Sequence, residues 1–183
     1  MGLGLCCEEA ARLILSQTEP FRLEIWEPGE ETPTDEEAAF FHFRHHYIQT
    51  LQNRTVPLAE RLPAPVGSPA EWAAFYFNLE RLDPHWNDLL KELQKVNQWQ
   101  LSPEQELPLE QLAVYLIYRH LADGFWEGDL QARIAFTALR VWMIATLTVC
   151  ADTPLEEVAR LYSAEIEYSD ENLLKILEKL AKK

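Results

Sequence analysis

Acidic and tyrosine side chains crowd into one short stretch near the C-terminus, residues 160–177, RLYSAEIEYSDENLLKIL. A carboxylate can take a proton from a substrate, and a tyrosine hydroxyl can orient or exchange one. These residue types at this density therefore suit the edge of an active site. The acids and tyrosines of the stretch are Glu165, Glu167, Asp170, Glu171, Tyr162 and Tyr168.

A junction between two helices explains most of the same pattern. Ser169 is a good N-cap, and Asp170 and Glu171 would follow it in a first turn, where the helix dipole favours negative charge. Glu165 and Glu167 would lie about 200° apart around the preceding helix, so they cannot share a face. The junction does not explain the acids and tyrosines before the cap, and both interpretations stay open.

Clustered histidines in FHFRHHYIQ lack the companions of a known metal motif. His42 and His46 are four residues apart and would share one face of a helix. A zinc protease needs a glutamate directly after the first histidine, and Phe43 stands there. A di-iron bundle needs a glutamate three residues before a histidine, and no histidine of this chain has one. Polar positions on an amphipathic helix are the favoured interpretation.

Motifs for nucleotides and thiol chemistry are sparse. The chain has no GxGxxG, P-loop or GxSxG segment, so a site of the usual Rossmann kind for S-adenosylmethionine or NAD is not visible.

Cys6 and Cys7 are adjacent and supply too few thiolates for a cluster, so they are inert or belong to a site completed elsewhere. With Cys150 they make three cysteines, which cannot form a closed disulfide framework and favour a reducing compartment.

A tryptophan lies among acidic residues in HLADGFWEGDLQAR. The simplest interpretation is a helix–helix connection, in which Gly124 ends one helix and Asp129 caps the next. The alternative is a binding surface. An exposed Trp126 beside carboxylates would attract a basic side chain by charge and by cation–π contact.

The composition limits the partners that we expect. The 183 residues carry a formal net charge of −14, which repels a phosphate backbone and excludes nucleic acid as an expected partner. The same charge suits a basic protein surface, or serves only solubility. The most apolar stretch, 141–151, is too short to span a bilayer, and no signal peptide is visible. We therefore expect no membrane contact and a cytoplasmic location.

Helix-start signals recur along the chain and predict an all-α protein. Ser68, Ser102 and Thr153 each precede a proline and stand three residues before a Glu or Gln, which is a capping box with proline at the first helical position. Thr34 begins the same box without the proline, and Asp83 precedes Pro84. We predict helices over about 8–17, 35–53, 58–62, 69–82, 84–99, 109–122, 130–149, 154–168 and 170–181, and one short extended segment at 21–26.

The segment 130–149 is apolar on nearly every face. A helix of this kind is surrounded by other helices. We therefore predict a single multi-helix domain over 34–183 around this buried helix. The region 1–33 would precede the domain with a helix, the extended segment and an acidic linker.

Four segments together resemble the bacterial flagellin lysine-N-methylases. LYSAEIEYSDENL at 161–173 is similar to the C-terminal signature of that family, and CCEEAARLIL at 6–15 is similar to its C-P-E-A-A-R-L. YIQTLQNRTVPLAERL at 47–62 and YLIYRHLADGFWEGDLQARIAFTAL at 115–139 resemble two further patterns. The segments occur in the family's order and cover nearly the whole chain, so the specificity lies in their combination.

The resemblance implies methyl transfer from S-adenosylmethionine to lysine ε-amines of flagellin, and an iron–sulfur cluster held by a cysteine-rich N-terminal half. This chain lacks that half, and Cys7 would match its last cysteine as a cluster ligand. We therefore expect a C-terminal fragment or a natural short form that is incomplete as an enzyme. The Arg and His of the signature are replaced here by Ala164 and Tyr168, which puts any role of those positions in doubt.

Methylation of a lysine needs a neutral amine, so a site must lower the amine pKa or remove a proton. Residue type and family position make Glu165, Glu167, Tyr118 and Tyr162 the candidate catalytic residues. The candidate substrate-binding residues on the same grounds are Arg119, Trp126, Asp129 and Asn172.

A second hypothesis comes from another class of function. The chain would be a non-enzymatic, acidic helical module that binds a basic protein or supports a cluster-bearing domain. A cysteine-rich stretch encoded before Met1 would favour the enzyme, and a true start at Met1 would favour the module.

Overall fold

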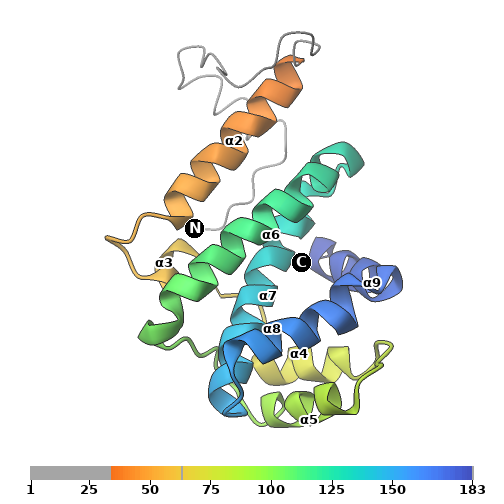
Figure 1. Ribbon diagram of the computed structural model, residues 1–183. Helices are drawn as coiled ribbons and strands as arrows, with labels where there is room; N and C mark the ends of the chain where they lie inside the picture. The colour runs from red at the N-terminus through yellow and green to blue at the C-terminus, as the bar shows by residue number, and fades with distance from the viewer. Residues whose placement is uncertain (1–33, 63, 183) are drawn as a thin grey trace.

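The structure is a computed structural model that describes residues 34–62 and 64–182. All regular elements in these ranges are helical (Figure 1), which confirms the all-α prediction. The predicted helix at 8–17, the extended segment at 21–26, Cys6 and Cys7 lie outside the described residues. The α-helices are α2 (Asp35–Leu51), α3 (Leu58–Arg61), α4 (Pro69–Tyr76), α5 (Pro84–Leu93), α6 (Glu106–Glu127), α7 (Leu130–Cys150), α8 (Leu155–Tyr162) and α9 (Asp170–Ala181).

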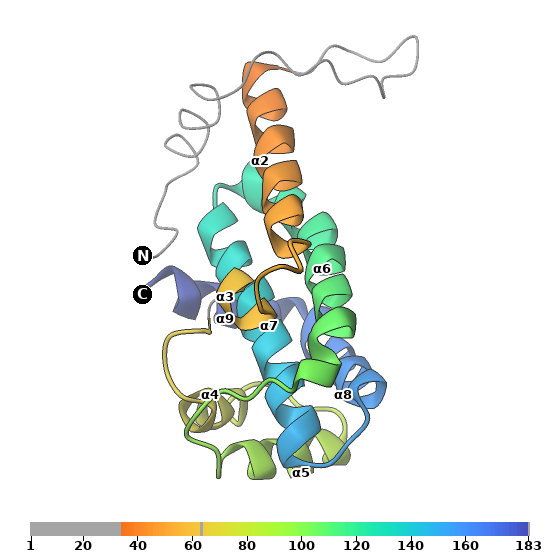
Figure 2. The same cartoon turned by 90° about the vertical axis from the view of Figure 1, so that its left-hand side faces the viewer.

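Helix α7 lies at the centre of the described helices. Figure 2 shows it running through the middle of the molecule, with α4 and α5 at one end and α2 projecting at the other. Helices α5, α6, α8 and α9 all contact it, and α2 packs on α6. Every side chain from Leu139 to Leu147 is buried. The predicted central helix is therefore confirmed.

Helix α7 is long and apolar enough, by length and composition, to cross a membrane. In the fold, however, 67% of its most apolar window is buried inside the protein. That environment is typical of the core helix of a soluble protein. The cytoplasmic location itself stays a prediction.

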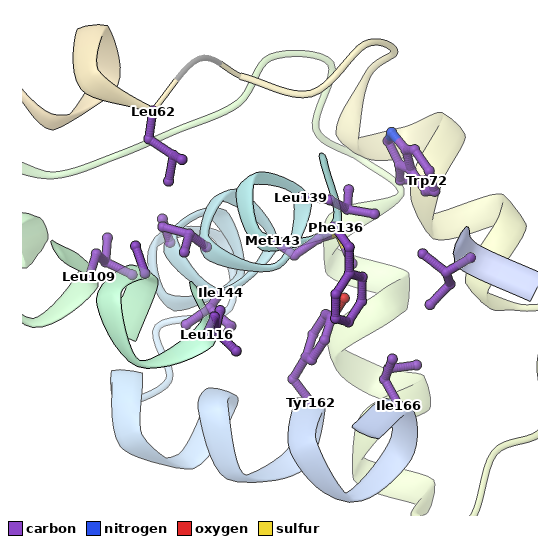
Figure 3. Close-up of a cluster of buried hydrophobic side chains, with 14 of the residues drawn as sticks. Leu62, Trp72, Leu109, Leu116, Phe136, Leu139, Met143, Ile144, Tyr162 and Ile166 are labelled. Carbon is purple, nitrogen blue, oxygen red and sulfur yellow. The ribbon is translucent and has the colours of Figure 1, made fainter. Parts of the chain in front are cut away.

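Aromatic and aliphatic side chains from several helices meet in the core (Figure 3). Phe136 and Met143 of α7 lie against Tyr162 of α8 and Ile166, which follows it, and all four are fully buried. Trp86 of α5 meets the Tyr162 ring edge-on, at 5.8 Å and 87°. Such an aromatic pair adds about 1 kcal/mol beyond its burial. Segment 161–173 thus contributes Tyr162 and Ile166 to the core.

Most of the predicted caps form. Thr34 and Ser68 each complete a capping box, at the starts of α2 and α4. Asp83 accepts from a backbone N–H at the start of α5, and Ser169 does the same at the start of α9. Each cap satisfies a donor that the first helical turn leaves unpaired, which explains why local sequence predicts these starts.

Two predicted helix starts differ in the structure. Ser102 begins a 3₁₀ turn, Pro103–Gln105, and α6 follows directly from it. The prediction that Thr153 caps a helix is wrong. Helix α8 begins after Pro154 without a side-chain cap, and the Thr153 hydroxyl donates instead to the Ala151 carbonyl.

Helix α6 runs further than predicted. It passes through Gly124 and ends at Gly128, whose φ of 77° is left-handed. A glycine takes this conformation without steric cost, so Gly128 is the natural stop. The prediction that Gly124 ends the helix is wrong. Its missing side chain serves close packing, because a Cβ there would lie 3.0 Å from the Cα of Leu130.

The predicted helix over 154–168 is divided in two. Helix α8 ends at Tyr162, and Ser163–Glu167 form a π-helix. Single π turns of this kind occur frequently at functional sites. Glu165 and Glu167, the two predicted proton acceptors, both lie in it.

Candidate functional site

The carboxylate of Glu167 lies at the centre of a buried group of polar side chains. It forms an ion pair with Arg140 of α7, and its Oε2 lies 3.2 Å from Arg119 Nε and 3.5 Å from His120 Nε2 on α6. The Ser163 hydroxyl donates to its other oxygen. Only 3% of the Glu167 side chain is exposed. We call these five residues the Glu167 cluster; it brings together two predicted site residues, Glu167 and Arg119.

The surroundings of Glu167 keep it ionised. Burial alone would raise its pKa, but the nearby His120 imidazole, the hydrogen bond from Ser163 and the charge of Arg140 outweigh burial and lower the pKa to about 2. An efficient general base has a pKa near the working pH. The geometry therefore supports Glu167 as an anchor for cationic side chains more than as a proton acceptor.

Arg140 carries the second buried charge of the cluster. Its Nη2 donates to the Ser163 hydroxyl at 3.1 Å, and its guanidinium lies 5.3 Å from the centre of the Tyr162 ring. Among the residues that the structure describes, Arg140 Nε and His120 Nε2 have no hydrogen-bond partner, since 3.5 Å is too long for a good hydrogen bond from His120. Unpaired buried donors are rare in native proteins and mark a strained or functional place.

Tyr162, a predicted catalytic residue, lies behind Arg140 and is fully buried. Its hydroxyl is 2.6 Å from the hydroxyl of Tyr76. Burial raises the pKa of both tyrosines above the usual range, so both keep their protons at neutral pH. The pair links α8 to α4 in the interior, without contact with solvent.

Glu165 points away from the Glu167 cluster, toward the connection between α4 and α5. Its carboxylate accepts the backbone N–H of Leu82 at 2.9 Å and that of Asp83 at 2.6 Å. The residue is 1% exposed. The expectation that Glu165 and Glu167 do not share a face is met, and in this arrangement Glu165 holds a loop in place.

Asn172 completes the same anchor. Its Oδ1 accepts the Glu80 N–H at 3.0 Å, and its Nδ2 donates to the carbonyls of Glu80 and Glu165 at 2.9 and 2.8 Å. Asn172 is 1% exposed. Its amide is thus engaged with backbone groups, and the predicted substrate-binding role stays a prediction.

Tyr118 lies apart from both groups. It is 55% exposed, and its ring lies 5.1 Å from the Arg44 guanidinium of α2. Phe40 and Phe41 contact the same guanidinium. Tyr118 therefore packs at the α2–α6 contact, and the structure does not bring it to the other predicted catalytic residues.

Trp126 and Asp129 lie at the turn between α6 and α7. Trp126 is 69% exposed, the most of any described tryptophan. Asp129, Glu127 and Asp123 surround the single guanidinium of Arg133, at 2.8, 2.6 and 3.6 Å. Three carboxylates therefore share one guanidinium at the turn that carries Trp126. We call Trp126 and these three acids the Trp126 surface.

The Glu167 cluster and the Trp126 surface lie apart on the molecule. Trp126 follows Arg119 by seven residues, which is about two helical turns or ~10 Å along α6. The predicted site residues therefore fall into a buried group around Glu167, an internal anchor at Glu165 and Asn172, and an exposed surface at Trp126. A single active site containing all of them does not form in the described residues.

The described helices do not by themselves fit an iron–sulfur cluster. They contain one cysteine, the half-buried Cys150, whose thiol pKa is raised by burial. No three His, Cys, Asp or Glu side chains converge as metal ligands within residues 34–62 and 64–182. Such a cluster normally takes three or four thiolates. Cys7 lies outside the described residues, so the cluster and S-adenosylmethionine stay predictions.

Sequence reasoning missed Arg140, His120 and Ser163. The sequence could have predicted that Arg140 is buried and paired, because a charged residue in a helix that is apolar on nearly every face must have a buried partner. It could not have predicted His120 and Ser163, since nothing in their local sequence shows that they face Glu167 across the fold.

A second ion-pair group attaches the α2–α3 segment to α6. Arg54 and Arg61 both bind Glu110, with closest distances of 2.8 Å. The Glu110 side chain is 2% exposed. Burial alone would raise its pKa, but the hydrogen bonds from Arg54 and Arg61 outweigh burial and lower the pKa. Both oxygens of Glu110 are occupied by arginine donors, so we interpret this group as a structural one.

Comparisons of the chain with protein-family models, with curated proteins and with solved structures found no match. Function is therefore inferred from the contacts of this chain's own residues.

Proposed function

We propose that this chain is a lysine-N-methylase-family protein whose helical domain holds the lysine-bearing substrate, flagellin by resemblance. The observation that carries the proposal is the exposed Trp126 at a turn where three carboxylates share one guanidinium. Methyl transfer from S-adenosylmethionine and the iron–sulfur cluster belong to the same family proposal. No described residue is assigned to either of those two groups.

The chemistry of the Trp126 surface suits a lysine side chain. Asp123 and Glu127 have side chains that are 58% and 62% exposed, so they can reach an incoming ammonium group. The indole can stack on the aliphatic stem of a lysine and attract its charge. The Phe125 ring meets Trp126 edge-on at 5.0 Å and supports its position.

The three resemblance segments that the structure describes, 47–62, 115–139 and 161–173, connect to one another through ion pairs, which also supports the proposal. Arg119 of segment 115–139 contacts Glu167 of segment 161–173. Arg54 and Arg61 of segment 47–62 bind Glu110 on α6, the helix that carries Arg119. Residues that are far apart in the chain therefore contact one another, and all of them except Glu110 lie in the segments that carry the resemblance.

The test measures binding of the full 183-residue chain to flagellin and to a lysine-rich peptide. We expect Trp126→Ala to weaken binding by about tenfold, the equivalent of one good cation–π contact. Tyr115→Ala is the matched control, because Tyr115 is an exposed aromatic on the same helix, at 52%, outside the Trp126 surface. Equal losses in both variants, or equal binding of a lysine-acetylated peptide, would overturn the proposal.

The alternative is the non-enzymatic module that binds a basic protein. The observation that favours it is that Glu165 and Glu167 are both saturated by internal donors. An assay of methyl transfer from labelled S-adenosylmethionine to flagellin separates the two functions. Retained binding without transfer supports the module, and transfer supports the enzyme.

A further inference from the structure

Positive charge exceeds negative charge inside the Glu167 cluster. Arg119 and Arg140 share the single carboxylate of Glu167, and no other carboxylate of the described residues lies within 4.0 Å of either guanidinium. Arg140 is 2% exposed. Two guanidinium groups therefore share one carboxylate, and the cluster has a charge that a further anion could balance.

Unused donors lie in the same place. Arg140 Nε and His120 Nε2 have no hydrogen-bond partner among the described residues, and both residues are more than nine-tenths buried. Arg140 Nη2 already donates to the Ser163 hydroxyl, and that hydroxyl donates to Glu167. A guanidinium N–H and an imidazole nitrogen, both buried without a partner beside an unbalanced positive charge, are what an anion-binding site offers before its ligand arrives.

The cluster also has a route to solvent. The Arg119 side chain is 44% exposed, whereas Arg140 and His120 are enclosed. Arg119 is therefore the member of the cluster that a ligand from solvent would meet first. His120 is held edge-on against Phe136 at 5.6 Å, which keeps its ring in position.

We propose that Arg119, His120 and Arg140 form a binding site for a small carboxylate ligand beside Glu167. Guanidinium groups bind planar carboxylates through paired hydrogen bonds, which makes this ligand class the best match. The inference is independent of the lysine-binding function proposed above. It concerns other residues and a ligand of opposite charge.

The test follows thermal unfolding of the full chain as acetate replaces chloride at constant ionic strength. A ligand that binds only the folded state raises the melting temperature in a saturable way. We expect Arg119→Gln to weaken the apparent affinity by about tenfold, the effect of losing one charge-assisted contact. Arg160→Gln is the control, because Arg160 is exposed and pairs with Glu157 on its own helix.

A second measurement reports on the buried residue directly. In a ¹⁵N-labelled sample, acetate should shift the Nε–H signal of Arg140 along the same saturation curve. The proposal fails if acetate gives no saturable stabilisation, or if Arg119→Gln and Arg160→Gln respond alike. Titration with a free amino acid and with a peptide bearing a free C-terminal carboxylate then identifies the source of the ligand by which of them binds more tightly.

Discussion

The ionised state of Glu167 makes the stability of the protein depend on acid. Its pKa is about 2 in the fold against an ordinary value of 4.5, so its contribution is complete above pH 4.5 and is lost as the pH falls toward 2. A depression of this size corresponds to about 3 kcal/mol of stability at neutral pH. The charged contacts of Glu167 are thus a substantial part of the free energy of unfolding.

We predict that Glu167→Gln lowers the free energy of unfolding at pH 7 by about 3–5 kcal/mol, because it leaves Arg140 buried without its partner. The variant should also lose the part of the acid dependence that lies between pH 4.5 and pH 2. Urea unfolding over this pH range measures both effects. Glu156→Gln, at an exposed position of α8, is the control. An unchanged acid profile in Glu167→Gln would contradict the assignment.

Asn172 gives a second prediction at the scale of one residue. Asn172→Ala removes hydrogen bonds to Glu80 and Glu165 and leaves buried backbone groups unpaired, so we expect a loss of about 2–3 kcal/mol. Asn78→Ala removes one exposed hydrogen bond, to the Ala74 carbonyl, and should cost about 0.5 kcal/mol. Similar losses in both variants would show that the α4–α5 loop does not depend on this anchor.

At the scale of elements, the contact between α6 and α7 depends on a missing side chain. A Cβ at Gly124 would lie 2.8 Å from Arg133 Cδ and 3.0 Å from Leu130 Cα. An alanine inside a helix normally stabilises it by roughly 0.5–1 kcal/mol relative to glycine. Here the close approach of the α7 backbone reverses that preference.

We predict that Gly124→Ala destabilises the protein by about 1–3 kcal/mol through overpacking. Gly128 provides the contrast, because it has open space around it but a φ of 77°. Gly128→Asn should be tolerated better than Gly128→Val, since asparagine adopts the left-handed region more readily. Thermal unfolding of the variants distinguishes the two mechanisms. A stabilised Gly124→Ala variant would contradict the packing argument.

The π-helix carries two acids that bind different partners. Glu165 binds the backbone ahead of α5, and Glu167 binds side chains of α6 and α7. One short element therefore fastens two distant parts of the chain to the C-terminal region. Because internal donors occupy both carboxylates, neither one faces solvent where it could accept a proton from a substrate.

At the scale of the whole molecule, the net charge of −14 should govern encounters with a basic partner. We predict that raising the salt from about 0.05 to about 0.5 M weakens binding of a lysine-rich flagellin peptide by about tenfold, because salt screens exposed charges. Fluorescence anisotropy at several salt concentrations measures the slope. Binding that is independent of salt would point to an apolar contact and away from the Trp126 surface.

Local sequence determined the helical class of this protein and most of its helix starts. Thr34, Ser68, Asp83 and Ser169 cap helices through groups only two or three residues away, so the pattern alone predicts them. The apolar character of α7 likewise required burial on all sides. Both features depend on neighbours within one or two helical turns.

Tertiary structure decided where the polar groups point and where α6 ends. Arg140 and His120 meet Glu167 only because α6, α7 and the π-helix pack together, and Glu165 turns to the α4–α5 loop because the backbone there needs acceptors. Helix α6 continues through Gly124, where the missing side chain lets the start of α7 approach closely. Contacts between residues distant in the chain are set by packing and by the pairing of buried polar groups, which local patterns do not record.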